Sequence, residues 1–131
     1  MSNVVARTVL GASAVALIVI GGGATFATSA FYGSYGIDAT GSVELASELR
    51  GIGMALLLLG MAIGVAVVRV RWVFPAAVAA AAVMLGFAVG RAGAAVLDGL
   101  PATSMVVAGV VELILGLAAA WVAVRNRPRG D

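Results

Sequence analysis

Long apolar runs separated by short polar segments divide the chain into four parts of similar length. About 20 apolar helical residues are enough to cross the hydrocarbon core of a membrane. The pattern therefore predicts transmembrane helices at residues 4–28, 44–68, 73–97 and 103–124. We expect one domain, residues 1–131, with an all-α fold: an integral membrane four-helix bundle.

The first apolar segment has a second interpretation as a cleaved signal peptide. Arg7 precedes the apolar run, and the small residues ATSA (27–30) follow it. Because the run is long for a signal peptide, we expect a retained helix.

The segments between the predicted helices carry turn and interface signals. Phe31, Tyr32 and Tyr35 suit the aromatic belt at a membrane surface. Ser42 suits the N-cap of the second helix. The sequence DGLPA (98–102) predicts a tight turn that makes the third and fourth helices antiparallel neighbours.

The composition places most of the chain in lipid rather than water. Hydrophobic residues make up 63% of the chain and charged residues 11%, whereas soluble domains carry about 25% charged residues. The chain has no Cys and no His, which excludes disulfides, zinc–cysteine sites and histidine-bound metal or haem. We therefore expect no cofactor and no metal.

The arginines predict the orientation in the membrane. Six of them fall on one side of a four-crossing topology: Arg7, Arg69, Arg71, Arg125, Arg127 and Arg129. The positive-inside rule then predicts cytoplasmic N- and C-termini. All eight cations are Arg, which is typical of GC-rich bacterial genomes, so we expect a multi-pass protein of a bacterial plasma membrane. Because topology accounts for the basic residues, we expect no nucleic-acid partner.

Small residues recur at helical spacing in three of the predicted helices. Such rows allow helix backbones to approach closely in lipid, and they predict a compact bundle without a water-filled channel. The same faces could instead contact another subunit. The rows are Gly60 and Gly64; Ala82, Gly86, Gly90 and Ala94; and Ala108, Gly109, Gly116 and Ala119.

Two charges lie deep in the apolar segments. At 1.5 Å per residue, Arg91 is about 10 Å below the outer end of the third helix and Glu112 about 13 Å below that of the fourth. Because these helices are predicted neighbours and an unpaired charge in a membrane is costly, we expect an Arg91–Glu112 ion pair.

Three further charges extend this pair into a predicted polar cluster. Asp98 lies seven residues after Arg91 and therefore on the same helix face. Glu48 shares the small-residue side of the second helix, which predicts that it faces inward, while Arg50 reaches Asp98 or Glu112 or extends to the surface. The cluster either binds a ligand or only fixes the helix register.

Three short motifs resemble an uncharacterised bacterial family of four-helix membrane proteins, domain of unknown function 4345. They are SELRGIGMALLLLG (47–60), GRAGAAVLDGLP (90–101) and VVELILGL (110–117). The resemblance covers roughly residues 10–125 and implies a four-helix membrane protein, with no established activity. It implies as motif positions Glu48, Leu49, Arg50, Gly90, Arg91, Asp98, Gly99, Pro101 and Glu112. The chain is also loosely similar to DoxX-like membrane proteins.

Three functions compete on these observations. Short loops and small-residue faces favour an accessory or scaffold subunit in a larger membrane complex or a homo-oligomer. The charged cluster favours the alternative, in which the protein binds or transports a small amphiphile, lipid or quinone. No nucleophile–base pair, metal motif or phosphate loop is present, so we expect no enzymatic activity.

Overall fold

Four long helices dominate the computed structural model, which describes residues 3–128. They are α1 (Asn3–Phe26), α3 (Val43–Val68), α4 (Val73–Asp98) and α5 (Thr103–Arg125). All four are long and apolar enough to cross a membrane. The predicted fold class is therefore confirmed, and the predicted helix ends are correct to within two residues.

Two short helices lie in segments that we predicted as connections. Helix α2 (Thr28–Gly33) follows α1 after a bend at Ala27, and the 3-10 helix η1 (Val70–Trp72) joins α3 to α4. Ser42 caps α3 as predicted, because its hydroxyl accepts a hydrogen bond from the Leu45 amide at 3.0 Å. Gly99 ends α4 with a φ of 101°, which suits a residue without a side chain.

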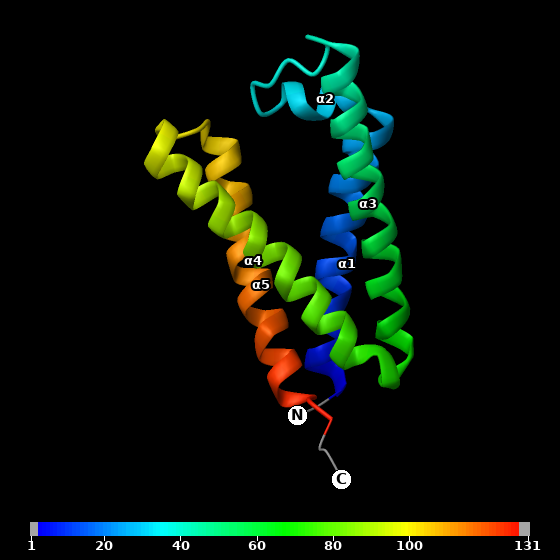
Figure 1. Cartoon of the computed structure of the whole chain (residues 1–131). Coiled ribbons are helices and arrows are strands. Elements are labelled where there is room, and N and C mark those ends of the chain that lie inside the picture. The colour runs from blue at the N-terminus through cyan, green and yellow to red at the C-terminus, as the bar shows by residue number, and fades with distance from the viewer. Residues whose placement is uncertain (1–2, 129–131) are drawn as a thin grey trace.

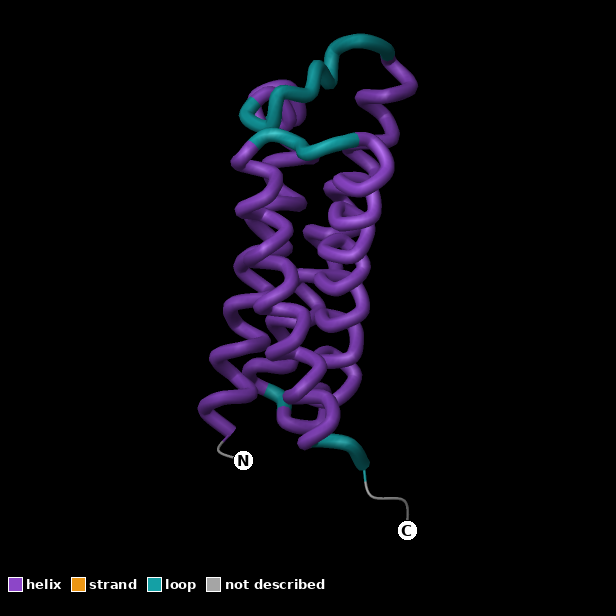
Figure 2. Tube along the Cα trace, turned by 90° about the vertical axis from the view of Figure 1, so that its left-hand side faces the viewer, coloured by secondary structure: helices purple, strands orange, loops and turns teal. Residues whose placement is uncertain are grey.

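The helices form two antiparallel pairs, α1 with α3 and α4 with α5 (Figure 1). At one end of the molecule, which we call the terminal end, lie η1 and the first and last described residues. The other end, the loop end, holds α2 and the α4–α5 turn. The two pairs pack together at the terminal end and separate toward the loop end (Figure 1). Viewed from the side of the α4–α5 pair, the long helices run lengthwise between the two ends of the molecule (Figure 2).

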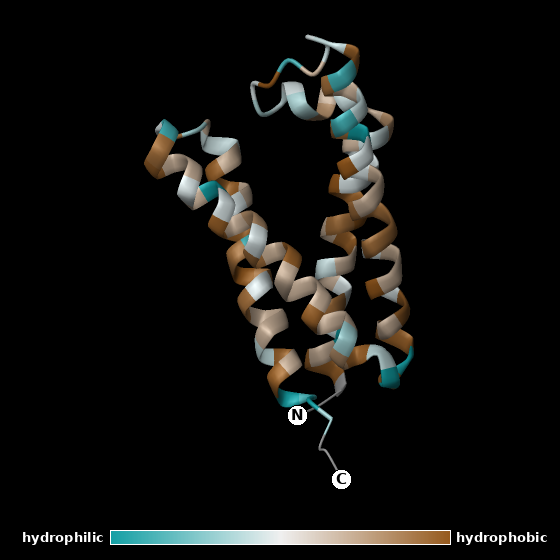
Figure 3. Ribbon diagram, in the orientation of Figure 1, coloured by the Kyte–Doolittle hydropathy of each residue, from teal (hydrophilic) through white to brown (hydrophobic). Residues whose placement is uncertain are grey.

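The arginines that we assigned to one side of the membrane follow this division. Five of them are exposed: Arg7 in α1, Arg69 and Arg71 at η1, Arg125 at the end of α5, and Arg127. The start of α1, η1 and the end of α5 all lie at the terminal end (Figure 1), while Arg129 lies outside the described residues. Hydrophilic residues gather toward the two ends of the helices, and apolar residues cover the length between them (Figure 3). This distribution is that of a protein whose long helices cross a bilayer side by side.

Glycines decide where the helices of each pair touch. A Cβ atom on Gly60 would lie 2.9 Å from the Ile18 amide nitrogen of α1, so the predicted small-residue contact of α3 includes Gly60. A Cβ atom on Gly116 would lie 2.8 Å from the Leu85 side chain of α4. These close approaches let the paired backbones pack without large interdigitating side chains.

The prediction of a compact bundle is wrong for the loop-end half of the molecule. The row Ala82, Gly86, Gly90 and Ala94 of α4 contacts no other helix face closely: all four residues are exposed, and a Cβ atom on Gly86 or Gly90 would meet nothing within 4 Å. Small residues permit a close helix contact but do not require one. Here they form one wall of an open cleft.

The core at the terminal end contains one buried hydroxyl without a partner. Ser13 of α1 is fully buried, and its Oγ makes no hydrogen bond to the described residues. A buried polar group in this state costs the free energy of its desolvation. We expect Ser13→Ala to leave the free energy of unfolding unchanged or raise it by up to about 1 kcal/mol.

Unfolding in mixed micelles, followed by circular dichroism, measures this change. Thr28→Val is the contrasting variant, because the buried Thr28 hydroxyl donates to the Ala24 carbonyl at 2.8 Å, and we expect a loss of about 0.5–1.5 kcal/mol. A destabilised Ser13→Ala protein would mean that the Ser13 hydroxyl has a partner after all.

Candidate functional site

A bidentate ion pair joins α4 to α5 in the loop-end half of the molecule. Arg91 Nε donates to Glu112 Oε2 at 2.8 Å, and Arg91 Nη2 donates to Glu112 Oε1 at 3.1 Å. The Glu112 side chain is 6% exposed and the Arg91 side chain 28% exposed. The Glu112 side chain is thus enclosed by protein, while part of the Arg91 side chain remains accessible.

Local packing sets the direction of the Arg91 side chain. The residue one helical turn earlier, Phe87, places its ring centroid 5.8 Å from the guanidinium carbon, within reach of a cation–π interaction. A Cβ atom on Gly109 would lie 3.4 Å from Arg91 Cδ. Since Gly109 has no side chain, the Arg91 stem can lie flat across α5 and bring the guanidinium to Glu112.

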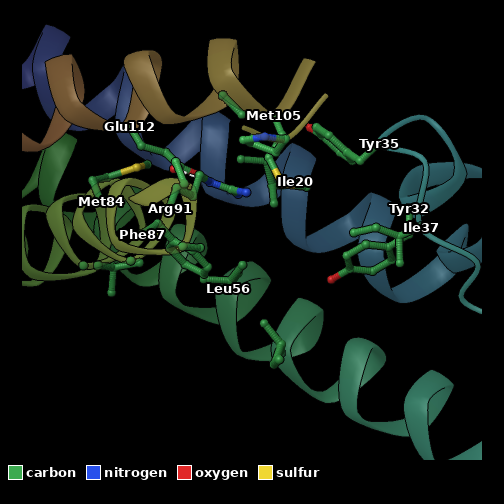
Figure 4. A pocket seen from close by; sticks show the side chains of 18 of the residues that line it. Ile20, Tyr32, Tyr35, Ile37, Leu56, Met84, Phe87, Arg91, Met105 and Glu112 are labelled. Atoms are coloured by element: carbon green, nitrogen blue, oxygen red, sulfur yellow. Dashed lines mark hydrogen bonds and ion pairs between the residues drawn. The ribbon is translucent and has the colours of Figure 1, made fainter. Parts of the chain in front are cut away.

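The ion pair lies in the wall of a cleft of about 800 Å³ between the two helix pairs. We call it the central cleft. Arg91, Glu112, Phe87 and Met105 line it from α4 and α5, and Ile20 and Leu56 line it from α1 and α3 (Figure 4). Sites that hold small molecules have volumes of about 300–1,000 Å³ and a mostly apolar lining with few polar groups. The central cleft fits that description.

Aromatic residues close the cleft toward the loop end. Tyr32 and Tyr35 lie across the cavity from Arg91 (Figure 4), and both rings pack edge-on against Phe31. Ser104 at the start of α5 donates a 3.4 Å hydrogen bond to the Ser34 carbonyl, which links this segment to the α4–α5 pair. The interfacial belt that we expected of these aromatic residues remains a prediction, and the structure places all three in the lining of the cleft.

The Tyr32 hydroxyl remains a hydrogen-bond donor at neutral pH. Partial burial raises the pKa of Tyr32, and the positive charge of Arg91 opposes this rise only in part. A protonated phenol both donates and accepts hydrogen bonds. The loop end of the cleft therefore offers an uncharged polar group to a molecule inside.

The structure brings together only part of the predicted five-residue cluster. Arg91 and Glu112 are bound to each other, and Asp98 lines the same cleft but is exposed and forms no ion pair within residues 3–128. Glu48 and Arg50 are exposed on α3, line no part of the cleft and form no ion pair with a described residue.

The prediction that Glu48 faces inward is therefore wrong. Its neighbours on that helix face, Gly51 and Ala55, are exposed too. The buried face of α3 near this end is instead the one containing Gly53, which packs against Thr25 of α1. Because α3 packs mainly on α1, that single contact decides which side of α3 is covered.

Sequence reasoning missed Phe87 and Met105 as lining residues of the cleft. Phe87 had a recognisable signal, because an aromatic residue four positions before an arginine lies on the same helix face. Met105 had none, since its position follows from how far the two pairs separate. In the part of the chain that the structure describes, no group of three acidic side chains lies close enough to hold a metal ion.

Four apolar helices of membrane-spanning length, arranged as two antiparallel pairs around a cleft, define a small multi-pass membrane protein. The family model described as domain of unknown function 4345 (DUF4345) matches residues 5–123. The chain belongs to that family, as its motifs suggested, and the match leaves the looser likeness to DoxX-like proteins untested. No curated protein and no solved structure matches the chain.

Proposed function

We propose that this protein binds a small amphiphile in the central cleft, with the tail among the apolar lining residues and the head at Arg91. The observation that carries the proposal is the placement of one partly exposed, ion-paired arginine side chain in the wall of a mostly apolar cleft of about 800 Å³. An amphiphile matches both properties at once, because its tail excludes water while its head accepts hydrogen bonds.

The exposed small-residue face of α4 supports the same function. Gly86 and Gly90 leave room above the helix backbone, so an alkyl chain can lie against it over several turns. The cleft is open rather than enclosed, since Ala82, Gly86 and Ala94 in its wall are exposed. With the termini in the cytoplasm, as the arginines predict, the cleft opens in the outer half of the membrane.

Filling the cleft with a side chain tests this function. Gly90→Leu adds a large apolar side chain to the cleft wall without a clash, because nothing lies within 4 Å of the point that a Cβ atom on Gly90 would occupy. We expect at least about a tenfold loss of affinity for a neutral single-chain probe, a diazirine-bearing monoacylglycerol. The protein is held in phosphatidylcholine nanodiscs, and labelled peptides are identified by mass spectrometry.

Gly93→Leu is the matched control. Gly93 lies on the same helix, is exposed and also has open space within 4 Å of its Cβ position, but it does not line the cleft. This variant should label like the wild type. The proposal would be contradicted if the label spread evenly over the lipid-facing helices and unlabelled monoacylglycerol did not displace it. Cross-linking between two copies through cleft residues would show instead that a second chain occupies the cleft.

Membership of a larger membrane complex, the other function that the sequence favoured, remains a prediction. Co-purification from mild detergent tests it directly. The expectation that the protein is not an enzyme likewise stays a prediction.

A further inference from the structure

We infer that Glu112 makes the head-binding part of the central cleft select an uncharged hydrogen-bond acceptor over an anion. The inference rests on the proposed function and deepens it by naming the class of head group. It places an uncharged carbonyl or hydroxyl head, as in a monoacylglycerol or an alkyl quinone, against the guanidinium of Arg91.

The first step is the number of donors that Arg91 has left. A guanidinium carries five N–H groups, and Glu112 accepts one from Nε and one from Nη2. No other acceptor among residues 3–128 binds the Arg91 side chain. Three N–H groups therefore remain, on a side chain that is 28% exposed and lines the cleft.

The second step is the charge around those donors. The charged residues that line the cleft are Arg91, Glu112 and Asp98, so their formal charges of +1, −1 and −1 sum to −1. Glu112 neutralises the guanidinium at hydrogen-bond distance, and Asp98 at the end of α4 adds a negative charge to the lining. The donors are thus present without the net positive charge that an anion requires.

The third step compares the two kinds of ligand. An anionic head would lose its hydration on entering the apolar cleft and would gain little Coulomb energy from a guanidinium that is already paired. A carbonyl or hydroxyl oxygen loses far less hydration and accepts the same N–H groups. The Tyr32 and Tyr35 hydroxyls across the cleft are further uncharged partners for such a head.

Competition between probes of similar chain length tests this selectivity on the wild-type protein in phosphatidylcholine nanodiscs. Dodecanoyl glycerol, decyl benzoquinone and dodecyl phosphate are each titrated against the diazirine-bearing monoacylglycerol at pH 7.5. We expect at least one uncharged probe to compete at least about tenfold better than dodecyl phosphate. Comparison of the first two probes separates an acylglycerol from a quinone as the source of the acceptor.

Glu112→Gln is the variant that isolates the cause. Glutamine keeps the shape and one acceptor oxygen but removes the negative charge, which leaves the Arg91 charge uncompensated. We expect dodecyl phosphate to bind at least about tenfold more tightly than in the wild type, and the uncharged probes to change by less than about threefold. Asp98→Asn is the matched control: it removes a cleft carboxylate that does not bind Arg91, and its effect on dodecyl phosphate should be several times smaller.

The outcomes separate the inference from the proposed function. If dodecyl phosphate competes as well as the uncharged probes in the wild type, the inference is overturned while the binding function stands. If no probe displaces the label, the proposed function itself fails. If Glu112→Gln and Asp98→Asn raise the affinity for dodecyl phosphate equally, Glu112 is not the residue that sets the selectivity. If Glu112→Gln does not fold, the comparison of probes on the wild-type protein alone tests the selectivity.

Discussion

Replacing Glu112 by Ala should destabilise the protein by about 2–4 kcal/mol. Removing one partner of a buried ion pair leaves the other charge uncompensated, which costs about 3–5 kcal/mol when that charge is fully buried. Arg91 is 28% exposed and its long side chain can turn toward the surface, which lowers the cost. Unfolding in mixed micelles, followed by circular dichroism, measures the loss.

A double-mutant cycle separates the uncompensated charge from the loss of contacts. We expect Arg91→Ala combined with Glu112→Ala to be at least as stable as Glu112→Ala alone, because no charge is then left without a partner. Glu48→Ala is the control: its carboxylate is exposed and unpaired within the described chain, and the change should stay within about 0.5 kcal/mol. Additive effects of the two single substitutions would show that the ion pair contributes nothing of its own.

The four spans and the ion pair could be predicted because each follows from a constraint that acts along the chain. Apolar length fixes the number of crossings, and the turn at Asp98–Gly99 makes α4 and α5 neighbours. Once those helices are antiparallel, rise per residue alone places Arg91 and Glu112 at similar depth. The structure shows them at hydrogen-bond distance.

The central cleft could not be predicted, because it depends on the angle between two helix pairs. Gly86 and Gly90 of α4 follow the same spacing as glycines that do mediate contacts, such as Gly60 of α3. Spacing within one helix carries no information on whether a second helix lies against it. The prediction that Glu48 faces inward failed for the same reason, since the direction of that side chain depends on which neighbouring helix covers α3.

Three glycines of α1 show that the environment of a glycine depends on which segment of the chain packs against it. The sequence has three consecutive glycines, residues 21–23, and only the structure shows that they differ. Gly21 is buried against the α3 backbone, Gly22 has open space around it, and Gly23 lies under the Phe31 ring. Their partners are more than 30 residues away for Gly21 and less than ten for Gly23.

This difference predicts opposite effects for two neighbouring Gly→Ala substitutions. A Cβ atom on Gly21 would press on the Leu57 amide nitrogen and lie 2.6 Å from the Gly53 carbonyl oxygen. Both are backbone atoms, so the alanine methyl group fits only if α1 and α3 move apart. We therefore expect Gly21→Ala to lower the free energy of unfolding by about 2–4 kcal/mol.

Gly22→Ala adds the same methyl group one residue later, where nothing lies within 4 Å. The substitution removes a glycine from a helix interior, so it should be neutral or stabilise by up to about 1 kcal/mol. Unfolding of both variants in mixed micelles tests the pair, and a cysteine cross-link between α1 and α3 reports whether the helices have separated. Equal stability of the two variants would show that α1 and α3 lie farther apart than the close approach of Gly21 to Leu57 requires.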